Sequence, residues 1–187
     1  MTSDLNFTKE GKPLSDSEKE KIRLEHEAAR LFMRLYENCF QVPIRHIWHN
    51  EPKKPDVSCY LNKERLDLEI AHLYGSEIEA MLVLGRNLGE ATWRYLNELA
   101  ATPPDERLLT ALNRLLANKA SKNYHSDRVW LVIRNANPLW VREDFLQRMQ
   151  AICLPDDHPF EEVWVVADFE GQSGLVKIHP LAPKRMS

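Results

Sequence analysis

The sequence is poor in cysteine and glycine, and each shortage excludes a class of protein. Its 187 residues contain three widely spaced cysteines, Cys39, Cys59 and Cys153, and no CxxC pair. This small, odd number argues against a disulfide framework and favours a reducing compartment, which predicts a cytoplasmic location. The six glycines form no GxxxxGK[ST] motif and no dinucleotide-binding loop, so the common glycine-rich phosphate cradles are excluded.

A basic surplus and long apolar runs are absent as well. The formal net charge is −3 and the pI is about 6.2, so nucleic-acid binding would require a local basic cluster. No stretch approaches the ~20 apolar residues of a membrane-spanning helix, and residues 1–12 lack the apolar region of a signal peptide. With 43% hydrophobic and 28% charged residues, we expect one globular domain over 15–180 between tails at 1–14 and 181–187.

Helical patterns begin near the N-terminus. Ser15 followed by Glu18 has the spacing of a capping box, and apolar residues recur at the helical period after it. This pattern predicts a first helix from Ser15 to about Tyr36. Further helices are predicted at 76–101, 105–120 and 140–151, with Pro103 and Pro104 separating the first two of these.

Six segments have the character of strands: 44–49, 56–61, 65–73, 129–133, 162–167 and 175–179. The second and third are joined by a tight connection and are predicted to form a hairpin. The fourth and fifth are almost entirely apolar, as expected for central strands covered on both faces. The order of elements predicts an α/β fold with a mixed β-sheet flanked by helices.

Two acidic residues stand out in the predicted hairpin. Alternation along its strands places Asp56 and Ser58 on one face of the first, and Asp67 and Glu69 on one face of the second. If the strands pair, Asp56 and Glu69 project from the same polar face. Adjacent carboxylates repel each other unless a cation or proton lies between them, and Mg²⁺ favours such oxygen ligands. The alternative is that each is an ordinary solvated residue of a turn or strand.

The residues Pro55-Asp56, followed by Glu69 within LDLEIAH, resemble the motif of the PD-(D/E)XK nuclease superfamily. The order helix, three strands, helix and strand over residues 24–133 is also similar to the αβββαβ core of that superfamily, the restriction-endonuclease-like fold. The resemblance implies a nuclease that depends on Mg²⁺ or Mn²⁺. It also implies the metal ligands, which are Asp56, Glu69 and the backbone carbonyl of Ile70.

The chain departs from the motif at its lysine, because the position two residues after Glu69 is Ala71. The best substitutes are Lys119 and Lys122, which directly precede the strand 129–133; Lys63 in the hairpin connection is another. A lysine here would hold the attacking water and offset phosphate charge. The alternative is that Lys119 and Lys122 are solvated charges in the last turn of a helix, where they favour its dipole.

Two further groups of residues are candidates for a role in a site. Glu27 shares the apolar stripe of the first helix, and in the superfamily that helix often lends a carboxylate to the site; the alternative is an exposed ion pair with Arg30. A zinc site is a different hypothesis for the residues His46, His49, His72 and Cys59, whose spacings match no common zinc pattern.

Two functions therefore stay open from the sequence. The first is a metal-dependent nuclease acting on DNA or RNA, with catalytic contributions from Asp56, Glu69, Lys119, Lys122 and Glu27. The second is a catalytically inactive protein of the same fold that serves as a binding module. In that case the predicted helices 76–101 and 105–120 are the expected partner surface, including that of a homodimer.

Overall fold

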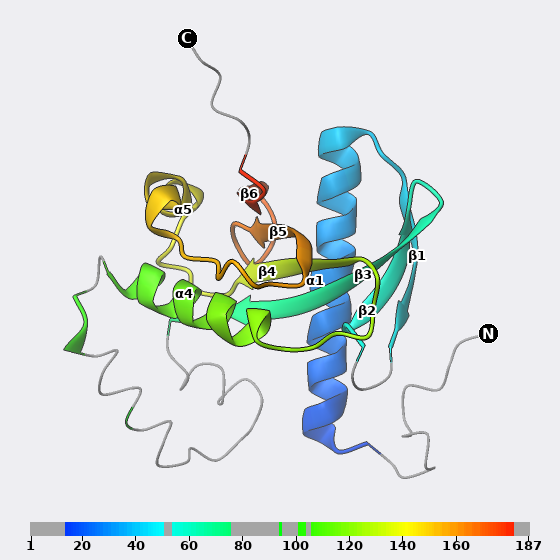
Figure 1. Cartoon of the computed structure of the whole chain (residues 1–187), viewed down its shortest axis with the longest axis horizontal. Coiled ribbons are helices and arrows are strands. Elements are labelled where there is room, and N and C mark those ends of the chain that lie inside the picture. Colours follow the sequence, from blue (N-terminus) through cyan, green and yellow to red (C-terminus); the bar gives the residue numbers. More distant parts are fainter. Residues whose placement is uncertain (1–13, 51–53, 76–93, 95–100, 104–105, 182–187) are drawn as a thin grey trace.

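A six-stranded β-sheet forms the centre of the computed structural model (Figure 1), which describes residues 14–50, 54–75, 94, 101–103 and 106–181. Its elements are α1 (Asp16–Phe40), β1 (Ile44–His49), β2 (Val57–Leu61), β3 (Glu64–Leu73), α4 (Arg107–Ala120), β4 (Val129–Asn135), α5 (Arg142–Gln147), a 3₁₀ turn (Met149–Ala151), β5 (Phe160–Val166) and β6 (Leu175–His179). The predicted α/β fold with a mixed sheet and flanking helices is confirmed.

The strands lie in the sheet in the order in which they occur in the chain. β2 is antiparallel to both of its neighbours, β1 and β3. β3, β4 and β5 are parallel, and β6 is antiparallel to β5. The predicted hairpin of β2 and β3 is confirmed. Asn62 and Lys63 connect it with φ values of 48° and 73°, as expected for the two-residue turn that matches strand twist.

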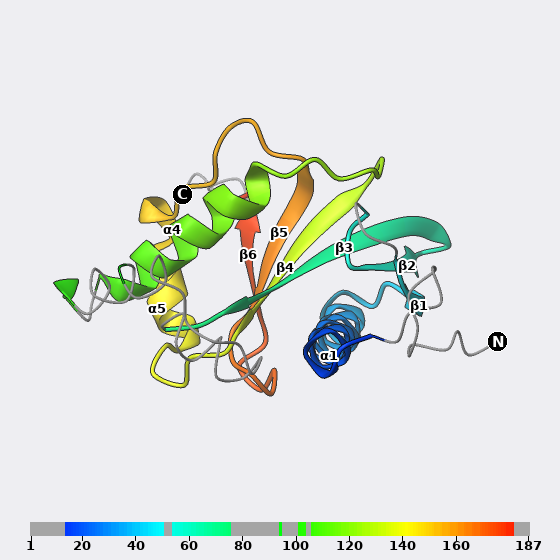
Figure 2. The same cartoon turned by 90° about the horizontal axis from the view of Figure 1, so that it is seen from below.

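Helices cover both faces of the sheet (Figure 2). On one face, α1 packs through Ala28, Phe32 and other apolar residues against Leu68, Ile70 and Trp130 of the strands. On the other face, α4 and α5 cover a second apolar cluster that includes the central residues of β4 and β5. Side chains of β4 are buried along its whole length, which explains its continuous run of apolar residues.

The first helix begins as predicted and extends farther than predicted. Ser15 caps α1, and the reciprocal contacts of Ser15 and Glu18 form the expected capping box. The helix continues past Tyr36 to Phe40, and Gln41 ends it in the left-handed conformation with φ 56°. Apolar periodicity fades over the last turn of α1, so the sequence pattern places the end too early.

Other predicted boundaries shift by a few residues, and some lie outside the described residues. The predicted helix at 140–151 is wrong in extent, since it divides into α5 and a 3₁₀ turn after an extended start in which Trp140 is buried. The predicted helix at 76–101 falls almost entirely outside the described residues. The predicted tails also lie there, apart from the single residues Leu14 and Leu181.

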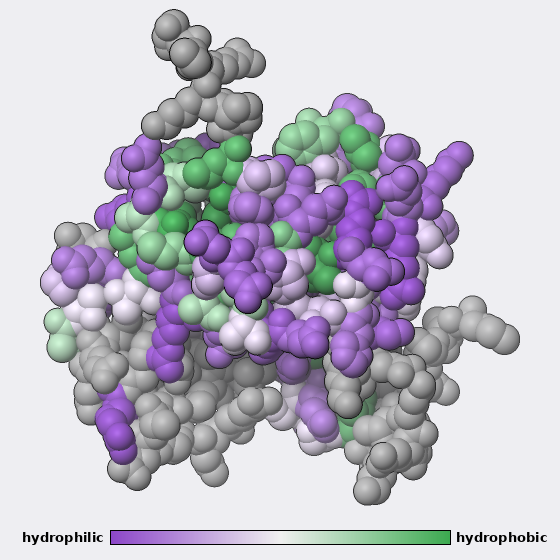
Figure 3. All heavy atoms as spheres, viewed as in Figure 1, coloured by the Kyte–Doolittle hydropathy of each residue, from purple (hydrophilic) through white to green (hydrophobic). Residues whose placement is uncertain are grey.

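Hydrophilic residues dominate the face of the molecule seen in Figure 3, and apolar residues gather at its upper left, where α5 lies in Figure 1. Around α5, Leu139, Val141 and Leu146 are exposed, with Leu139 at 82%. The candidate site described next lies elsewhere, where β2 begins alongside the middle of β3.

Candidate active site

The β2–β3 hairpin holds Asp56 and Glu69 at neighbouring positions. Val57 pairs with Leu68 in the antiparallel register, so Asp56, one residue earlier, lies opposite Glu69. Oδ2 of Asp56 accepts a hydrogen bond of 2.8 Å from the backbone N–H of Ile70. The Asp56 side chain thus links the residue that precedes β2 to the backbone of β3.

Glu69 is a buried carboxylate. Its exposed fraction is 4%, and its position in β3 has the same parity as Ala71, which packs in the cluster beneath α4. Burial raises the pKa of Glu69; the Lys119 ammonium opposes this rise, and the charge of Asp56 adds to it. The two carboxylates therefore interact electrostatically, as the shared-face hypothesis requires.

Lys119 reaches this pair from the last turn of α4. Its Nζ lies 2.5 Å from Oε1 of Glu69 and donates a hydrogen bond of 3.0 Å to the carbonyl oxygen of Ile70. The Lys119 side chain is 17% exposed, so the contact is largely removed from water. Of the two interpretations of Lys119, the structure supports the one that places its ammonium at the site, against the carboxylate of Glu69.

The packing of α4 on β3 explains why Lys119 lies next to Glu69. Leu116 and Ala120 of α4 lie in one apolar cluster with Ala71 of β3, so the last turn of the helix sits over the strand. A small side chain at position 71 allows this close approach. Lys119 of α4 therefore supplies an ammonium on the face of β3 that Glu69 and Ala71 share.

Lys122 and Tyr124 follow α4 and line the same region. Lys122 is exposed, but it interacts electrostatically with Glu69 and Asp56; burial and then the charge of Lys119 lower its pKa. The Tyr124 hydroxyl donates a 3.2 Å hydrogen bond to the backbone carbonyl of Lys119. Burial, followed by the nearby Glu69 carboxylate, raises the pKa of Tyr124. Lys63, by contrast, lies in the turn at the opposite end of β2.

A carboxylate from α1 completes the cluster, and it is Glu25 rather than Glu27. Glu25 is 6% exposed, and burial together with the negative charge of Asp56 raises its pKa to about 7. Nζ of Lys21 lies 3.4 Å from Oε1 of Glu25 and interacts with Asp56 and Glu69 as well. A carboxyl group with such a pKa exchanges its proton near neutral pH.

Glu27 points to a different neighbourhood. Its Oε1 accepts a hydrogen bond of 2.7 Å from Arg23, and its Oε2 lies 3.9 Å from Nη1 of Arg134. The sequence did contain a signal for Glu25: it precedes Ala29 by four residues and Phe32 by seven, and both are fully buried. Three positions at this spacing share one helix face, so Glu25 was the acidic residue on the inward stripe.

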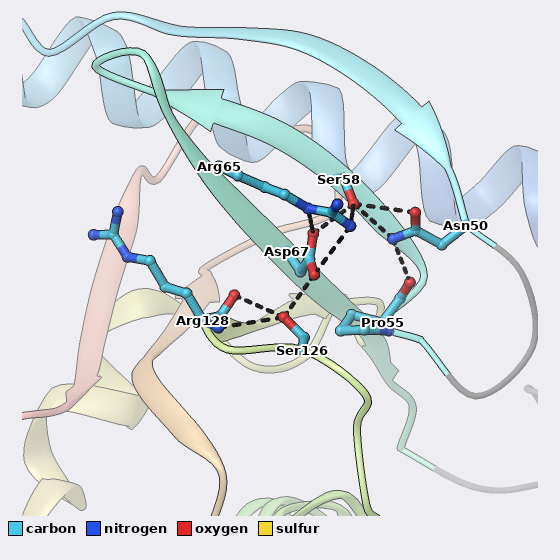
Figure 4. Close-up of polar contacts among 7 residues, drawn as sticks. All are labelled: Asn50, Pro55, Ser58, Arg65, Asp67, Ser126 and Arg128. Carbon is cyan, nitrogen blue, oxygen red and sulfur yellow. Dashed lines mark hydrogen bonds and ion pairs between the residues drawn. The ribbon is translucent and has the colours of Figure 1, made fainter.

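A buried polar network around Asp67 supports the hairpin (Figure 4). Asp67 is 2% exposed and accepts hydrogen bonds from the hydroxyls of Ser58 at 2.5 Å and Ser126 at 2.6 Å, and from Nε of Arg65 at 3.1 Å. These contacts join β2, β3 and the segment between α4 and β4. A buried carboxylate with this many donors is well compensated for its loss of water.

The network also fixes the chain that leads to Asp56. Nδ2 of Asn50 donates to the hydroxyl of Ser58 and to the carbonyl of Pro55, each at 2.8 Å. The backbone N–H of Asn50 donates to the carbonyl of Asp56 at 3.0 Å. The hydrogen bonds of Asn50 thus tie Pro55 and Asp56 to the framework around Asp67.

The histidines and Cys59 do not converge. The ring of His46 lies against Tyr60 and that of His49 against His26. Burial raises the pKa of Cys59 to about 12 within the apolar cluster under α1. Among the described residues, no group of three or more His, Cys, Asp or Glu side chains is placed to hold a metal ion, so the zinc hypothesis gains no support from this part of the chain.

The oxygen atoms near Lys119 are of the type that a hard divalent cation takes as ligands. Mg²⁺ needs only one or two carboxylates and takes further oxygen ligands and water. Asp56, Glu69 and the carbonyl of Ile70 supply this type of donor set. The ammonium of Lys119, a monovalent cation, contacts two of these three groups.

Comparisons with known proteins add no evidence on this site. No protein-family model, no curated protein and no solved structure matches this chain. Among the residues described, no helix is both long enough and apolar enough to cross a membrane.

Proposed function

We propose that the protein is a metal-dependent nuclease with a restriction-endonuclease-like core, and that it hydrolyses phosphodiester bonds of DNA or RNA. The observation that carries the proposal is that the ammonium of Lys119 contacts Glu69 and the carbonyl of Ile70, while Asp56 on the paired strand accepts a hydrogen bond from the N–H of Ile70. Carboxylates and a lysine at one buried point combine cation binding with neutralisation of phosphate charge.

Each residue has a role that follows from its chemistry. Asp56, Glu69 and the Ile70 carbonyl would hold Mg²⁺ or Mn²⁺, which when bound acidifies water and polarises a phosphoryl oxygen. The ammonium of Lys119 neutralises negative charge on the phosphate, and Lys122 adds positive charge at the exposed side. Glu25 exchanges a proton at its carboxylate near pH 7, which suits a general base or acid.

The test is cleavage of labelled single- and double-stranded DNA and RNA with Mg²⁺, with Mn²⁺ and with a chelator. Asp56→Asn and Glu69→Gln keep the shape of the side chains and should abolish cleavage. Glu64→Gln is a matched control, because Glu64 lies on the same strand but has an 80% exposed side chain, and it should retain full activity. Cleavage that persists in Asp56→Asn and Glu69→Gln, or in chelator, would remove the proposal.

A second candidate function is a non-catalytic binding module of the same fold. The specific observation in its favour is that Lys119 already satisfies Glu69 and the Ile70 carbonyl, so the pair is electrostatically complete without another cation. Melting curves separate the two functions. A cation present at a hundredfold above its dissociation constant stabilises the native state by about 2.7 kcal/mol. No change in melting temperature with Mg²⁺ or Mn²⁺ would favour the binding module.

A further inference from the structure

A hollow of about 340 Å³ opens between α1 and the loop that joins β5 to β6. The loop runs beside α1 in both Figure 1 and Figure 2. The volume is at the small end of small-molecule sites. Its lining residues are Glu27, Arg30, Leu31, Arg34, Arg134 and Glu170. None of these belongs to the cluster of Asp56, Glu69 and Lys119.

Arg134 of β4 is the buried part of this hollow. Arg134 is 5% exposed, yet only some of the N–H donors of its guanidinium have hydrogen-bond acceptors. Nε donates to the carbonyl of Phe169 at 2.8 Å, and the guanidinium lies 3.6 Å from the centroid of the Phe169 ring. Nη1 is buried and has no hydrogen-bond partner among the described residues.

The nearest carboxylate does not satisfy Nη1. Oε2 of Glu27 lies 3.9 Å from it, which is too far for a hydrogen bond, and Glu27 is already bonded to Arg23 at 2.7 Å. A buried charged donor without an acceptor is unfavourable. Phe169 therefore holds Arg134 in place, and Nη1 is left without an acceptor among the described residues.

Two more arginines face the same hollow from α1. Arg30 and Arg34 are four residues apart, which places them on one side of the helix, with Leu31 between them. Both are exposed, and no hydrogen bond or ion pair joins either of them to another residue in the described part of the chain. Three arginines and two glutamates, Glu27 and Glu170, thus line the same hollow.

The wall of the hollow opposite α1 is the β5–β6 loop, whose conformation is fixed by hydrogen bonds within the loop. The Asp168 carboxylate accepts hydrogen bonds from the backbone N–H groups of Glu170 at 2.9 Å and Gln172 at 3.1 Å. Gly171 has φ +76°, and a Cβ there would lie 2.7 Å from Cδ1 of Leu31. The absence of a side chain at this position lets the loop approach α1 closely, so the distance between the walls is set by packing.

We propose that this hollow binds the phosphate group of a nucleotide unit, with Arg30, Arg34 and Arg134 as its ligands. Planar guanidinium groups donate paired hydrogen bonds that match phosphate oxygen atoms. Glu27 and Glu170 accept hydrogen bonds from a sugar hydroxyl or an amino group, which favours a phosphate attached to a nucleoside. The phosphate belongs either to a nucleic-acid backbone or to a free mononucleotide. The proposal does not depend on hydrolysis at Asp56 and Glu69.

The test measures binding by fluorescence anisotropy, using the full chain and short labelled DNA and RNA oligonucleotides in a chelator, so that no cleavage occurs. The key variant is Arg30→Gln with Arg34→Gln, because both residues are exposed and the fold does not need them. The matched control is Arg114→Gln with Arg142→Gln, which removes the same charge from α4 and α5. Competition with unlabelled nucleoside monophosphates distinguishes the two sources of phosphate.

The key variant should weaken binding about tenfold, while the control stays close to the wild type. The slope of log affinity against log salt concentration should also become shallower, by about 0.7–0.9 for each phosphate that no longer binds an arginine. Displacement of the oligonucleotide by nucleoside monophosphates would assign the site to free nucleotides, and failure to displace it would assign the site to the polymer. Equal affinities in the key variant and the control would overturn the proposal, and so would a wild type that binds neither ligand.

Discussion

Replacing Lys119 by methionine should destabilise the protein at alkaline pH far more than at acidic pH. The substitution keeps an unbranched side chain, one atom shorter, and removes the ammonium that lies 2.5 Å from Glu69. Glu69, at 4% exposure, would then be a buried carboxylate without its cation. Breaking a buried ion pair by removing one partner costs about 3–5 kcal/mol, and we expect the lower end, about 3 kcal/mol, because Lys119 keeps some contact with water.

The pH dependence follows from the protonation of Glu69. Removal of Lys119 removes the charge that lowers the pKa of Glu69, so this pKa rises further above 4.5. A carboxyl group whose pKa is higher in the folded state than in the unfolded state favours folding below the unfolded value, and this stability is lost as the pH rises through the folded value. The variant should therefore be close to the wild type at pH 4.5 and weakest at pH 8.

Urea unfolding of the wild type and Lys119→Met at both pH values measures the effect. A loss of about 3 kcal/mol corresponds to a fall in melting temperature of about 6–12 °C for a domain of this size. The double variant Lys119→Met with Glu69→Gln should recover part of the loss at pH 8, because it contains no unpaired buried charge. Equal stability of Lys119→Met and the wild type at pH 8, or a loss that does not change with pH, would refute this account of the site.

Three further predictions concern other parts of the molecule. Glu25→Gln should remove a fall in stability between pH 4.5 and pH 8, since a pKa raised from 4.5 to about 7 corresponds to roughly 3 kcal/mol; parallel urea titrations check this, and an unchanged pH profile would contradict it. Thiol reagents should modify two cysteines of the native protein, the exposed Cys39 and Cys153, and should reach the buried Cys59 only after unfolding; modification of all three in the native state would show that Cys59 is accessible. Gly171→Ala should lower stability by about 1–3 kcal/mol because of its positive φ and its contact with α1, and a neutral result in thermal melting would show that the loop adapts.

The hydrogen-bond network around Asp67 positions residues of the candidate site without belonging to its charged cluster. The hydrogen bonds that Asp67 accepts from Ser58 and Ser126 connect the segments on either side of the site. Loss of one such bond to a buried charged group costs about 1–3 kcal/mol. We expect disruption of this network to affect the placement of Asp56 through Asn50, rather than the charge at Glu69.

Local patterns were sufficient to predict most of the elements. The capping box at Ser15 and Glu18, the alternation along β3 and the apolar run of β4 each depend on interactions between residues close in the sequence. The pairing of β2 with β3 also follows from a two-residue turn, because such a turn fixes the register of its hairpin. The proximity of Asp56 and Glu69 was therefore accessible from the sequence.

Long-range packing decided the rest. The reach of Lys119 to Glu69, 50 residues earlier, depends on how α4 lies over β3. The sequence holds a signal for each of two glutamates: Glu25 is at helical spacing from the buried Ala29 and Phe32, and Glu27 from the buried Leu24 and Leu31. The rotation of α1 about its axis, set by tertiary packing, decides that Glu25 is the one that faces inward. The gathering of Arg30, Arg34 and Arg134 around one hollow has the same origin. Arg30 and Arg34 belong to α1 and Arg134 to β4, and local sequence carries no information on which elements become neighbours.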